Sequence, residues 1–218
     1  MKFLFSKTFW NRKRTEKKLD KYNEPNKPFF VLMFFSSLIA ALGLVLDSVA
    51  VVIGSMMIAP IITPVFGFGL NFLTFQIKDS IKALGIILLG TLVGVISAYL
   101  SGLSVEYLAG EEIGKTAQII SRIEPNLLHL MVAVFSGMVG AYAYSTPDLS
   151  ERIVGIAISV ALIPPLATVG IGLAMMEPNV WRNSSLLYLA NLAGIISGSM
   201  IMFVLLGFGT EAEESVAE

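Results

Sequence analysis

Cysteine is absent from this 218-residue chain, and histidine occurs once, at His129. Disulfides, thiol nucleophiles and Cys-ligated metals are therefore excluded, and one histidine provides no histidine cluster for zinc. Charged residues make up only 14% of the chain, against roughly 25% in a soluble domain, while 55% is hydrophobic. Neither a Ser-His-Asp set nor a phosphate loop with its lysine is visible. We therefore expect a membrane protein rather than an enzyme, with no metal, no cofactor and no nucleic-acid partner.

The few charges are unevenly distributed. Nine of the fifteen lysines and arginines fall within residues 1–28, whereas residues 209–218 carry only acidic charges. The positive-inside rule predicts that the leader 1–28 is cytoplasmic. Aromatic residues alternate with basic ones in this leader, as in a helix that lies on anionic lipid. The alternative is a solvated leader that only sets the topology.

Six hydrophobic regions approach the length of about 20 residues that a spanning helix needs. We therefore expect an all-α, polytopic protein. The second region is too long for one straight span. The six regions are roughly Phe29–Leu46, Ser48–Phe75, Ile81–Leu103, Leu127–Tyr144, Ile153–Met176 and Ser185–Phe208.

Paired prolines interrupt the second and fifth of these regions. They are Pro60 and Pro64 in the one and Pro164 and Pro165 in the other, each pair followed by spaced glycines. Proline donates no backbone hydrogen bond and clashes with the preceding turn. A break at bilayer depth is tolerated only against protein or a water-filled cavity. Two matched breaks in two halves are typical of a transport site.

Weak internal similarity relates the two halves at an offset of about one hundred residues. The clearest match joins Leu89–Ser97 with Leu189–Ser197. We expect two three-helix repeats, 29–103 and 127–208, joined by a loop, 104–126, that contains a short interfacial helix. If every segment crosses, the odd number makes the repeats inverted, about an axis in the membrane plane.

The same crossing count predicts a topology. Both termini would be cytoplasmic in the inner membrane, with twelve basic residues inside and three outside. If segments two and five are instead re-entrant hairpins, the distribution is eleven to four, so charge does not separate the two arrangements. The length of segment two favours full crossings. Small residues four apart, such as Gly194 and Gly198, suit close helix packing, in part within a homo-oligomer.

Polar groups near the two breaks are the candidate site. Free backbone groups at the half-helix ends favour small ions or polar solutes, and Thr63 is expected to cap the half-helix that begins at Pro64. The alternative is that each break is only a kink, at which neighbouring helices satisfy the freed backbone groups. The candidate path residues are Ser55, Pro60, Thr63, Pro64, Thr91, Ser159, Pro164, Pro165, Thr168 and Asn191.

Asp47 and Asn191 each have two possible roles, and His129 has one. Asp47 is expected to cap segment two, with a cation gate as the alternative. Asn191 is expected to join helices, with a ligand role as the alternative. His129 is interpreted as an interfacial side chain near the outer end of span four.

Two strings resemble a known family. The first is Ser48–Pro64, in which Gly54, Met56 and two prolines fall at fixed spacing, and the second is Ser159–Gly170. Both resemble the signature blocks of the bacterial and archaeal membrane family known as domain of unknown function 389. The likeness covers roughly residues 29–208. It implies a membrane domain centred on the proline blocks and brings no established activity.

Two functions are consistent with these observations. The first is a transporter or channel for a small solute or ion, with the broken segments forming its path. The second is a non-transporting scaffold or lipid-binding module that anchors a complex. A hydrated cavity that joins the two proline blocks would favour the first, and a dry, packed junction would favour the second.

Overall fold

A computed structural model describes residues 26–110, 113–146 and 151–209, without the side chains of residues 108, 109 and 151–160. Within these ranges every regular element is a helix, which confirms the all-α class. The predictions for the basic leader before residue 26, for the acidic tail after residue 209 and for the Ser159 side chain lie outside the described residues.

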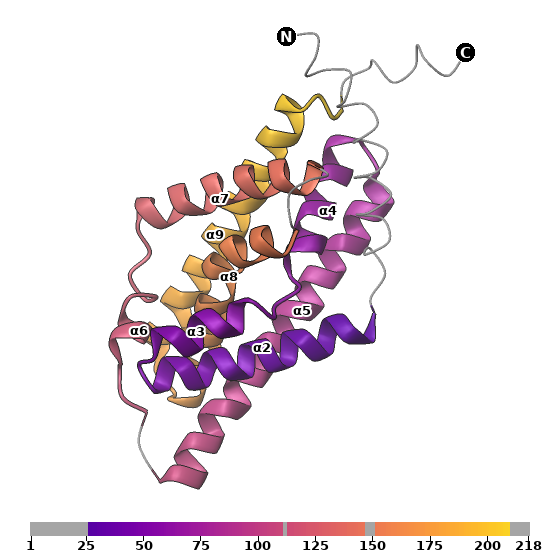
Figure 1. Ribbon diagram of the computed structural model, residues 1–218. Coiled ribbons are helices and arrows are strands. Elements are labelled where there is room, and N and C mark those ends of the chain that lie inside the picture. Colours follow the sequence, from indigo (N-terminus) through magenta and orange to yellow (C-terminus); the bar gives the residue numbers. More distant parts are fainter. Residues whose placement is uncertain (1–25, 111–112, 147–150, 210–218) are drawn as a thin grey trace, which may run out of the picture.

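Figure 1 shows the helices in chain order. The elements are α2 (Lys27–Val45), α3 (Val49–Met56), α4 (Ile62–Leu73), α5 (Ile77–Ser104), η1 (Val105–Ala109), α6 (Ala117–Ile120), α7 (Leu127–Ser145), α8 (Glu151–Ala174) and α9 (Pro178–Leu205).

Four of these helices are long and apolar enough to cross a membrane: α2, α5 with the start of η1, α7 and α9. Less than half of the apolar window of each is buried inside the protein. Their outer faces instead carry large apolar side chains such as Phe35, Leu88, Phe135 and Leu189. Unpartnered apolar faces on long helices indicate that the protein associates with a membrane.

Four of the six predicted spans thus correspond to helices of spanning length among the described residues. At 1.5 Å per residue, α3 covers about 12 Å and α4 about 18 Å, each short of a hydrocarbon core of about 30 Å. Sequence length alone could not reveal the interruption of segment two, because a broken hydrophobic run counts the same as a straight one.

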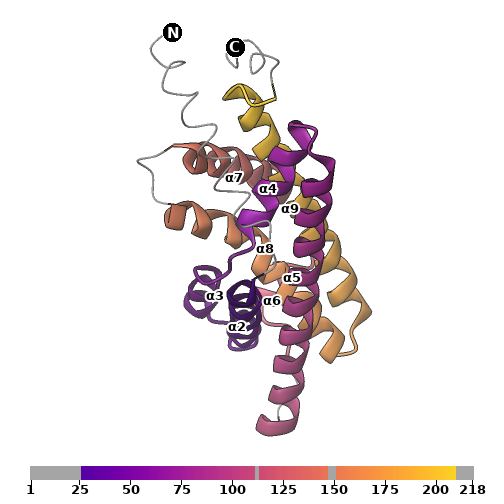
Figure 2. The same cartoon turned by 90° about the vertical axis from the view of Figure 1, so that its right-hand side faces the viewer.

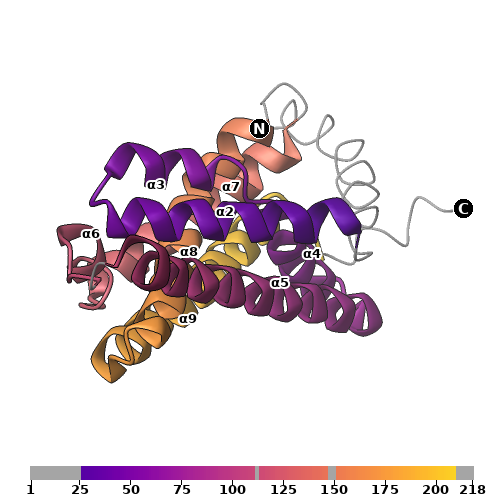
Figure 3. The same ribbon diagram turned by 90° about the horizontal axis from the view of Figure 1, so that it is seen from below.

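The long helices form two pairs of equal length. α2 and α7 have 19 residues each, and α5 and α9 have 28 each. Figure 1 shows that α2 and α7 run in roughly opposite directions, and that α5 and α9 also do. In Figure 2, α5 and α9 lie along the long axis of the molecule. Seen from below, α2 lies between α3 and α5, both of which it contacts (Figure 3).

The ends of these helices also correspond. Asn26 Oδ1 accepts a hydrogen bond from Phe29 N at 2.9 Å, and Asn126 Oδ1 accepts one from His129 N at 3.0 Å. Each asparagine satisfies an orphan donor in the first turn of α2 or α7.

The two longest helices each follow a residue in the left-handed region. Phe75 has φ 57° before α5, and Met176 has φ 53° before α9. In both turns the next N–H reaches back to a carbonyl of the preceding helix, Gln76 N to Asn71 O at 2.8 Å and Glu177 N to Gly172 O at 3.0 Å. These turns end α4 and α8 with the carbonyls of their last turns satisfied.

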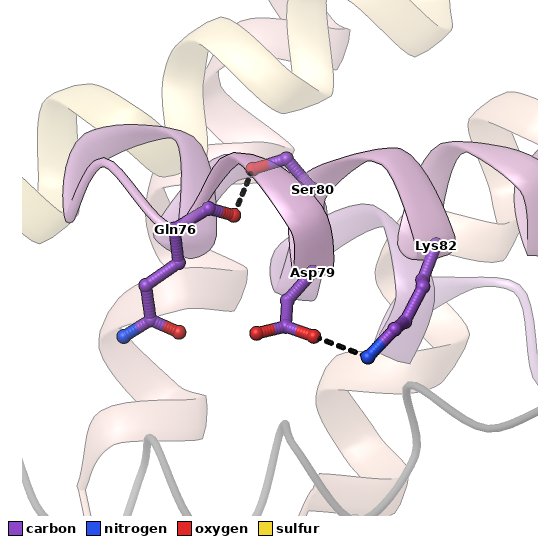
Figure 4. Close-up of polar contacts among 4 residues, drawn as sticks. All are labelled: Gln76, Asp79, Ser80 and Lys82. Carbon is purple, nitrogen blue, oxygen red and sulfur yellow. Dashed lines mark hydrogen bonds and ion pairs between the residues drawn. The ribbon is translucent and has the colours of Figure 1, made fainter.

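The first turn of α5 carries polar groups, drawn in Figure 4. Lys82 Nζ lies 2.7 Å from Asp79 Oδ1, and Ser80 Oγ donates to Gln76 O at 3.1 Å. An acidic residue in a first turn interacts favourably with the helix dipole. This end of α5 therefore suits a polar boundary of the membrane.

The two proline blocks differ in structure. In segment two, α3 ends at Met56 and α4 begins at Ile62, with Pro60 between them. Pro64 lies inside the first turn of α4, and the N-cap is Ile61, so the expected cap at Thr63 is wrong. In segment five, α8 continues through Pro164 and Pro165. The expected division of that segment into two half-helices is therefore wrong.

The loop between the two predicted repeats contains the four-residue α6, capped by Thr116. One smaller expectation is corrected. Asp47 is not the cap of segment two, because Ser48 occupies that position. Instead Asp47 ends α2 with φ 50°, and its Oδ1 accepts a hydrogen bond from Gln118 N at 3.0 Å. The carboxylate ties the loop to the end of α2.

Glycines allow the closest helix contacts. A Cβ on Gly137 of α7 would meet the backbone of Ile195, and a Cβ on Gly198 of α9 would meet the backbone of Val134. The backbones of α7 and α9 therefore approach each other without intervening side chains, as small residues permit in membrane proteins. The core beside them is aromatic, with Phe66 packed edge-on against Phe203 and Tyr144.

Candidate functional site

A cavity lies at each proline block. The first has a volume of about 150 Å³ and lies between the start of α2, the start of α4 and α5. Its lining is mainly apolar and carries no charged side chain. The lining residues are Asn26, Pro28, Phe29, Leu32, Pro60, Thr63, Pro64 and Ile86.

The second cavity, of about 180 Å³, reaches from the loop before α7 to the middle of α9. It combines an apolar wall with a cation and three further polar side chains. The lining residues are Ser121, Arg122, His129, Val132, Ala161, Pro165, Leu187 and Asn191.

Asn191 repairs the helix at the second proline block. Pro165 has no N–H, so the carbonyl of Ala161, four residues earlier, loses its usual donor. Asn191 Nδ2 donates to this Ala161 oxygen at 2.8 Å from the middle of α9. A buried carbonyl would otherwise go unsatisfied. This bond explains how α8 continues through its prolines, and it matches the interpretation of Asn191 as a residue that joins helices.

The amide oxygen of Asn191, Oδ1, lacks a hydrogen-bond partner among the described residues. Asn191 is 3% exposed, and this oxygen is buried. His129 Nδ1, on the same cavity, is also buried without a partner there. Two residues that line the second cavity therefore each carry a buried polar atom without a partner among the described residues.

Arg122 provides the positive charge of the second cavity. Its Nη1 donates to Gln118 O and, at 2.7 Å, to Ser121 Oγ. No carboxylate of the described residues lies within ion-pair distance of it. Burial lowers the pKa of the Arg122 guanidinium from its ordinary value, but an arginine remains charged at neutral pH.

Ser55, Thr91 and Thr168 line neither cavity. Ser55 and Thr168 are fully buried, and each hydroxyl donates to its own helix, Ser55 Oγ to Val52 O and Thr168 Oγ1 to Pro164 O. Thr91 Oγ1 lies 2.5 Å from Tyr188 Oη and joins α5 to α9. The structure brings Pro60, Thr63 and Pro64 together in one cavity and Pro165 and Asn191 in the other. Neither of these two cavities is lined by both proline blocks.

Sequence reasoning missed Arg122 and gave His129 only an interfacial role. Both come from the loop side of the second cavity, which the linear sequence separates from Pro165 and Asn191. The available signal was the weak internal similarity, since Phe29 and His129, one hundred residues apart in the chain, each line one of the two cavities. Among the described residues, no three His, Asp or Glu side chains gather as metal ligands.

Comparison with known proteins gives a family but no activity. The chain is 27% identical over 180 residues to the uncharacterized protein MJ0678 of Methanocaldococcus jannaschii, an alignment that covers 82% of this chain. The chain spans about half the length of that relative, 54%. No solved structure matches the chain. The family model described as "Domain of unknown function (DUF389)" matches residues 56–197, which include both proline blocks. By this match the chain belongs to the DUF389 family.

Proposed function

We propose that this protein is a transporter or channel for a small solute or ion, and that its path uses the two cavities at the proline blocks. The observation that carries the proposal is the placement of these cavities at equivalent positions of the two halves. Phe29 and Leu32 of the first correspond at an offset of one hundred to His129 and Val132 of the second. A structural accident at one proline would not recur at the other.

Two inverted repeats form the framework of this proposal. Equal lengths, paired asparagine caps and opposite directions of the helix pairs α2/α7 and α5/α9 support it. In such an arrangement the cavities face opposite sides of the membrane. The basic leader then places the first cavity on the cytoplasmic side, with both termini on that side of the inner membrane and α3–α4 and α8 completing six crossings.

Leu162, Ile163 and Leu166 of α8 are fully buried, and they neighbour the cavity residues Ala161 and Pro165 in sequence. We expect this packed layer to close the path between the two cavities, as in a carrier at rest, since alternating access never opens both sides together. Transport then needs a movement that lets the solute pass this layer.

A flux assay tests the proposal. The purified protein is reconstituted into liposomes, and entry of glycerol, L-lactate, L-serine and potassium chloride is followed by light scattering. We expect faster entry of at least one solute than into empty liposomes, and slower entry with Thr63→Val or Asn191→Leu. These substitutions remove polarity at roughly constant volume. A parent protein that accelerates none of the panel would contradict the proposal.

One observation favours the second function, a non-transporting scaffold or lipid-binding module. The hydroxyls of Ser55 and Thr168 are already bonded within their own helices, so the junction beside them is dry and packed. Under this alternative the protein does not accelerate solute entry in the flux assay. Anionic lipid instead stays bound through purification, and its removal lowers the thermal stability of the protein.

A further inference from the structure

We propose that the second cavity binds a small oxyanion that also carries a hydrogen-bond donor, such as a hydroxycarboxylate, held between Arg122 and Asn191. This inference deepens the proposed function, on which it rests for its biological meaning, by naming the class of solute. The binding itself is separate from transport and is measured without a membrane gradient.

The anionic end of the ligand is defined by Arg122. Nη1 of the guanidinium is engaged by Gln118 O and Ser121 Oγ, and no bond to a described residue is recorded for Nε or Nη2. A guanidinium presents its remaining donors in a planar fork that suits the two oxygens of a carboxylate or phosphate. With no described carboxylate beside it, the cation is available for a ligand.

The loop holds this arginine in place. Thr116 Oγ1 donates to Leu44 O at 2.7 Å, and Gln118 N donates to Asp47 Oδ1 at 3.0 Å. Gln118 O in turn accepts from the Arg122 guanidinium. Two bonds thus fix the loop to the end of α2, so the ordering of Arg122 is largely complete before a ligand arrives, which lowers the entropic cost of binding.

The second contact is defined by Asn191. Its Nδ2 is committed to Ala161 O, and the opposite Oδ1 is buried without a partner. This oxygen can only accept, so the group that satisfies it must be a hydroxyl, an ammonium or an amide N–H. A buried acceptor without a donor is unfavourable. A ligand with a donor near its anionic group would offset part of that penalty.

The first cavity provides the contrast. At the position of His129 it has Phe29, and neither an arginine nor a buried amide contributes to its lining. In the second cavity His129 Nδ1 adds a third polar atom, while Val132, Leu187 and Pro165 keep the remaining wall apolar. A volume of about 180 Å³ suits a molecule of several non-hydrogen atoms. The two halves would thus differ in chemistry: the second recognises the solute, and the first lets it pass.

Matched probes separate the two contacts. We would titrate the detergent-purified protein with L-lactate, with propionate, which lacks the hydroxyl, and with lactamide, which lacks the charge, using calorimetry. We expect L-lactate to bind at least tenfold more tightly than either analogue. This selectivity is read on the parent protein, so it does not depend on the folding of a variant.

Variants locate the binding. Arg122→Gln should weaken L-lactate binding at least tenfold, and His129→Phe, which copies the first cavity, should weaken it less. Arg182→Gln, which removes an exposed arginine outside the second cavity, serves as the control and should leave the affinity unchanged.

A lipid headgroup can also carry an anionic group with a nearby hydrogen-bond donor. A second experiment therefore distinguishes a lipid headgroup from a free solute. Phosphatidylserine carries a carboxylate and an ammonium, so its retention in nanodiscs is compared between the parent and Arg122→Gln by native mass spectrometry. Arginine-dependent binding of L-lactate alone indicates a free solute, and arginine-dependent retention of the lipid indicates a headgroup. Binding in neither arm, or binding that Arg122→Gln leaves intact, would overturn the inference, whatever the flux assay gives.

Discussion

Proline removes one backbone donor, and the two proline blocks of this chain respond to that loss differently. Before Pro60 the helix stops at Met56, and Ser55 O accepts from Ile58 N at 3.2 Å and from Ser36 Oγ at 2.8 Å. At Pro165 the helix continues, and Asn191 supplies a donor to Ala161 O. A side chain from a neighbouring helix thus replaces the donor that Pro165 lacks. Neither partner is visible in a linear sequence.

Replacing Asn191 with leucine should destabilise the protein by about 1–3 kcal/mol, because the buried Ala161 carbonyl loses its donor. Asn183→Leu is the matched control, since Asn183 lies on the same helix and no hydrogen bond is recorded for its side chain; its effect should stay within about 0.5 kcal/mol. The free energy of unfolding would be measured by reversible SDS titration. Equal effects of the two substitutions would show that the bond to Ala161 contributes no stability.

Replacing Met176 with glycine should raise stability by about 1 kcal/mol. Met176 has φ 53° and an exposed side chain, so a Cβ there brings strain and little packing. Leu173→Gly, within the last turns of α8, is the control with opposite sign, since glycine there costs about 1 kcal/mol and some packing. The same SDS titration measures both. A loss of stability on Met176→Gly would mean that the Met176 side chain makes a contact worth more than the strain.

Helices were more predictable than their interruptions. Four of the six predicted hydrophobic regions correspond closely to α2, α5, α7 and α9, because a lipid-facing helix shows its apolar character in every residue. The repair of the helix at Pro165 and the two cavities depend on contacts between residues far apart in the chain. Pro60, Thr63 and Pro64 were placed together by their spacing, whereas Arg122 reaches the second cavity only through the loop that Asp47 anchors. Thr91 was expected to face a solute and instead bonds Tyr188.

The crossing of α7 and α9 should be the contact least tolerant of an added methyl group. Gly198→Ala should destabilise by about 1–3 kcal/mol, because the new Cβ overlaps the Val134 backbone, which cannot move as a side chain can. Gly85→Ala on α5 is the control: nothing lies within 4 Å of its Cβ position, and alanine in a helix gains about 0.5–1 kcal/mol over glycine. The two substitutions should therefore have opposite signs in the SDS titration. A neutral Gly198→Ala would show that α7 and α9 lie further apart than described.

At the scale of the whole molecule, the proposal depends on two halves that face opposite sides of the membrane. Helix lengths, asparagine caps and the left-handed turns at Phe75 and Met176 recur at offsets of one hundred or one hundred and one residues. Because the chain has no cysteine, a single introduced cysteine reports its own accessibility without background. Equivalent positions in the two cavities can therefore be compared directly.

The most direct test labels Leu32→Cys and Val132→Cys, one in each cavity, with a membrane-impermeant maleimide. Labelling is carried out in right-side-out and inside-out vesicles, and both variants must retain the flux of the parent. If the cavities are entrances related by an inverted repeat, Leu32→Cys reacts only from the cytoplasmic side and Val132→Cys only from the opposite side. Reaction of both cysteines from the same side, or of neither from any side, would contradict the account.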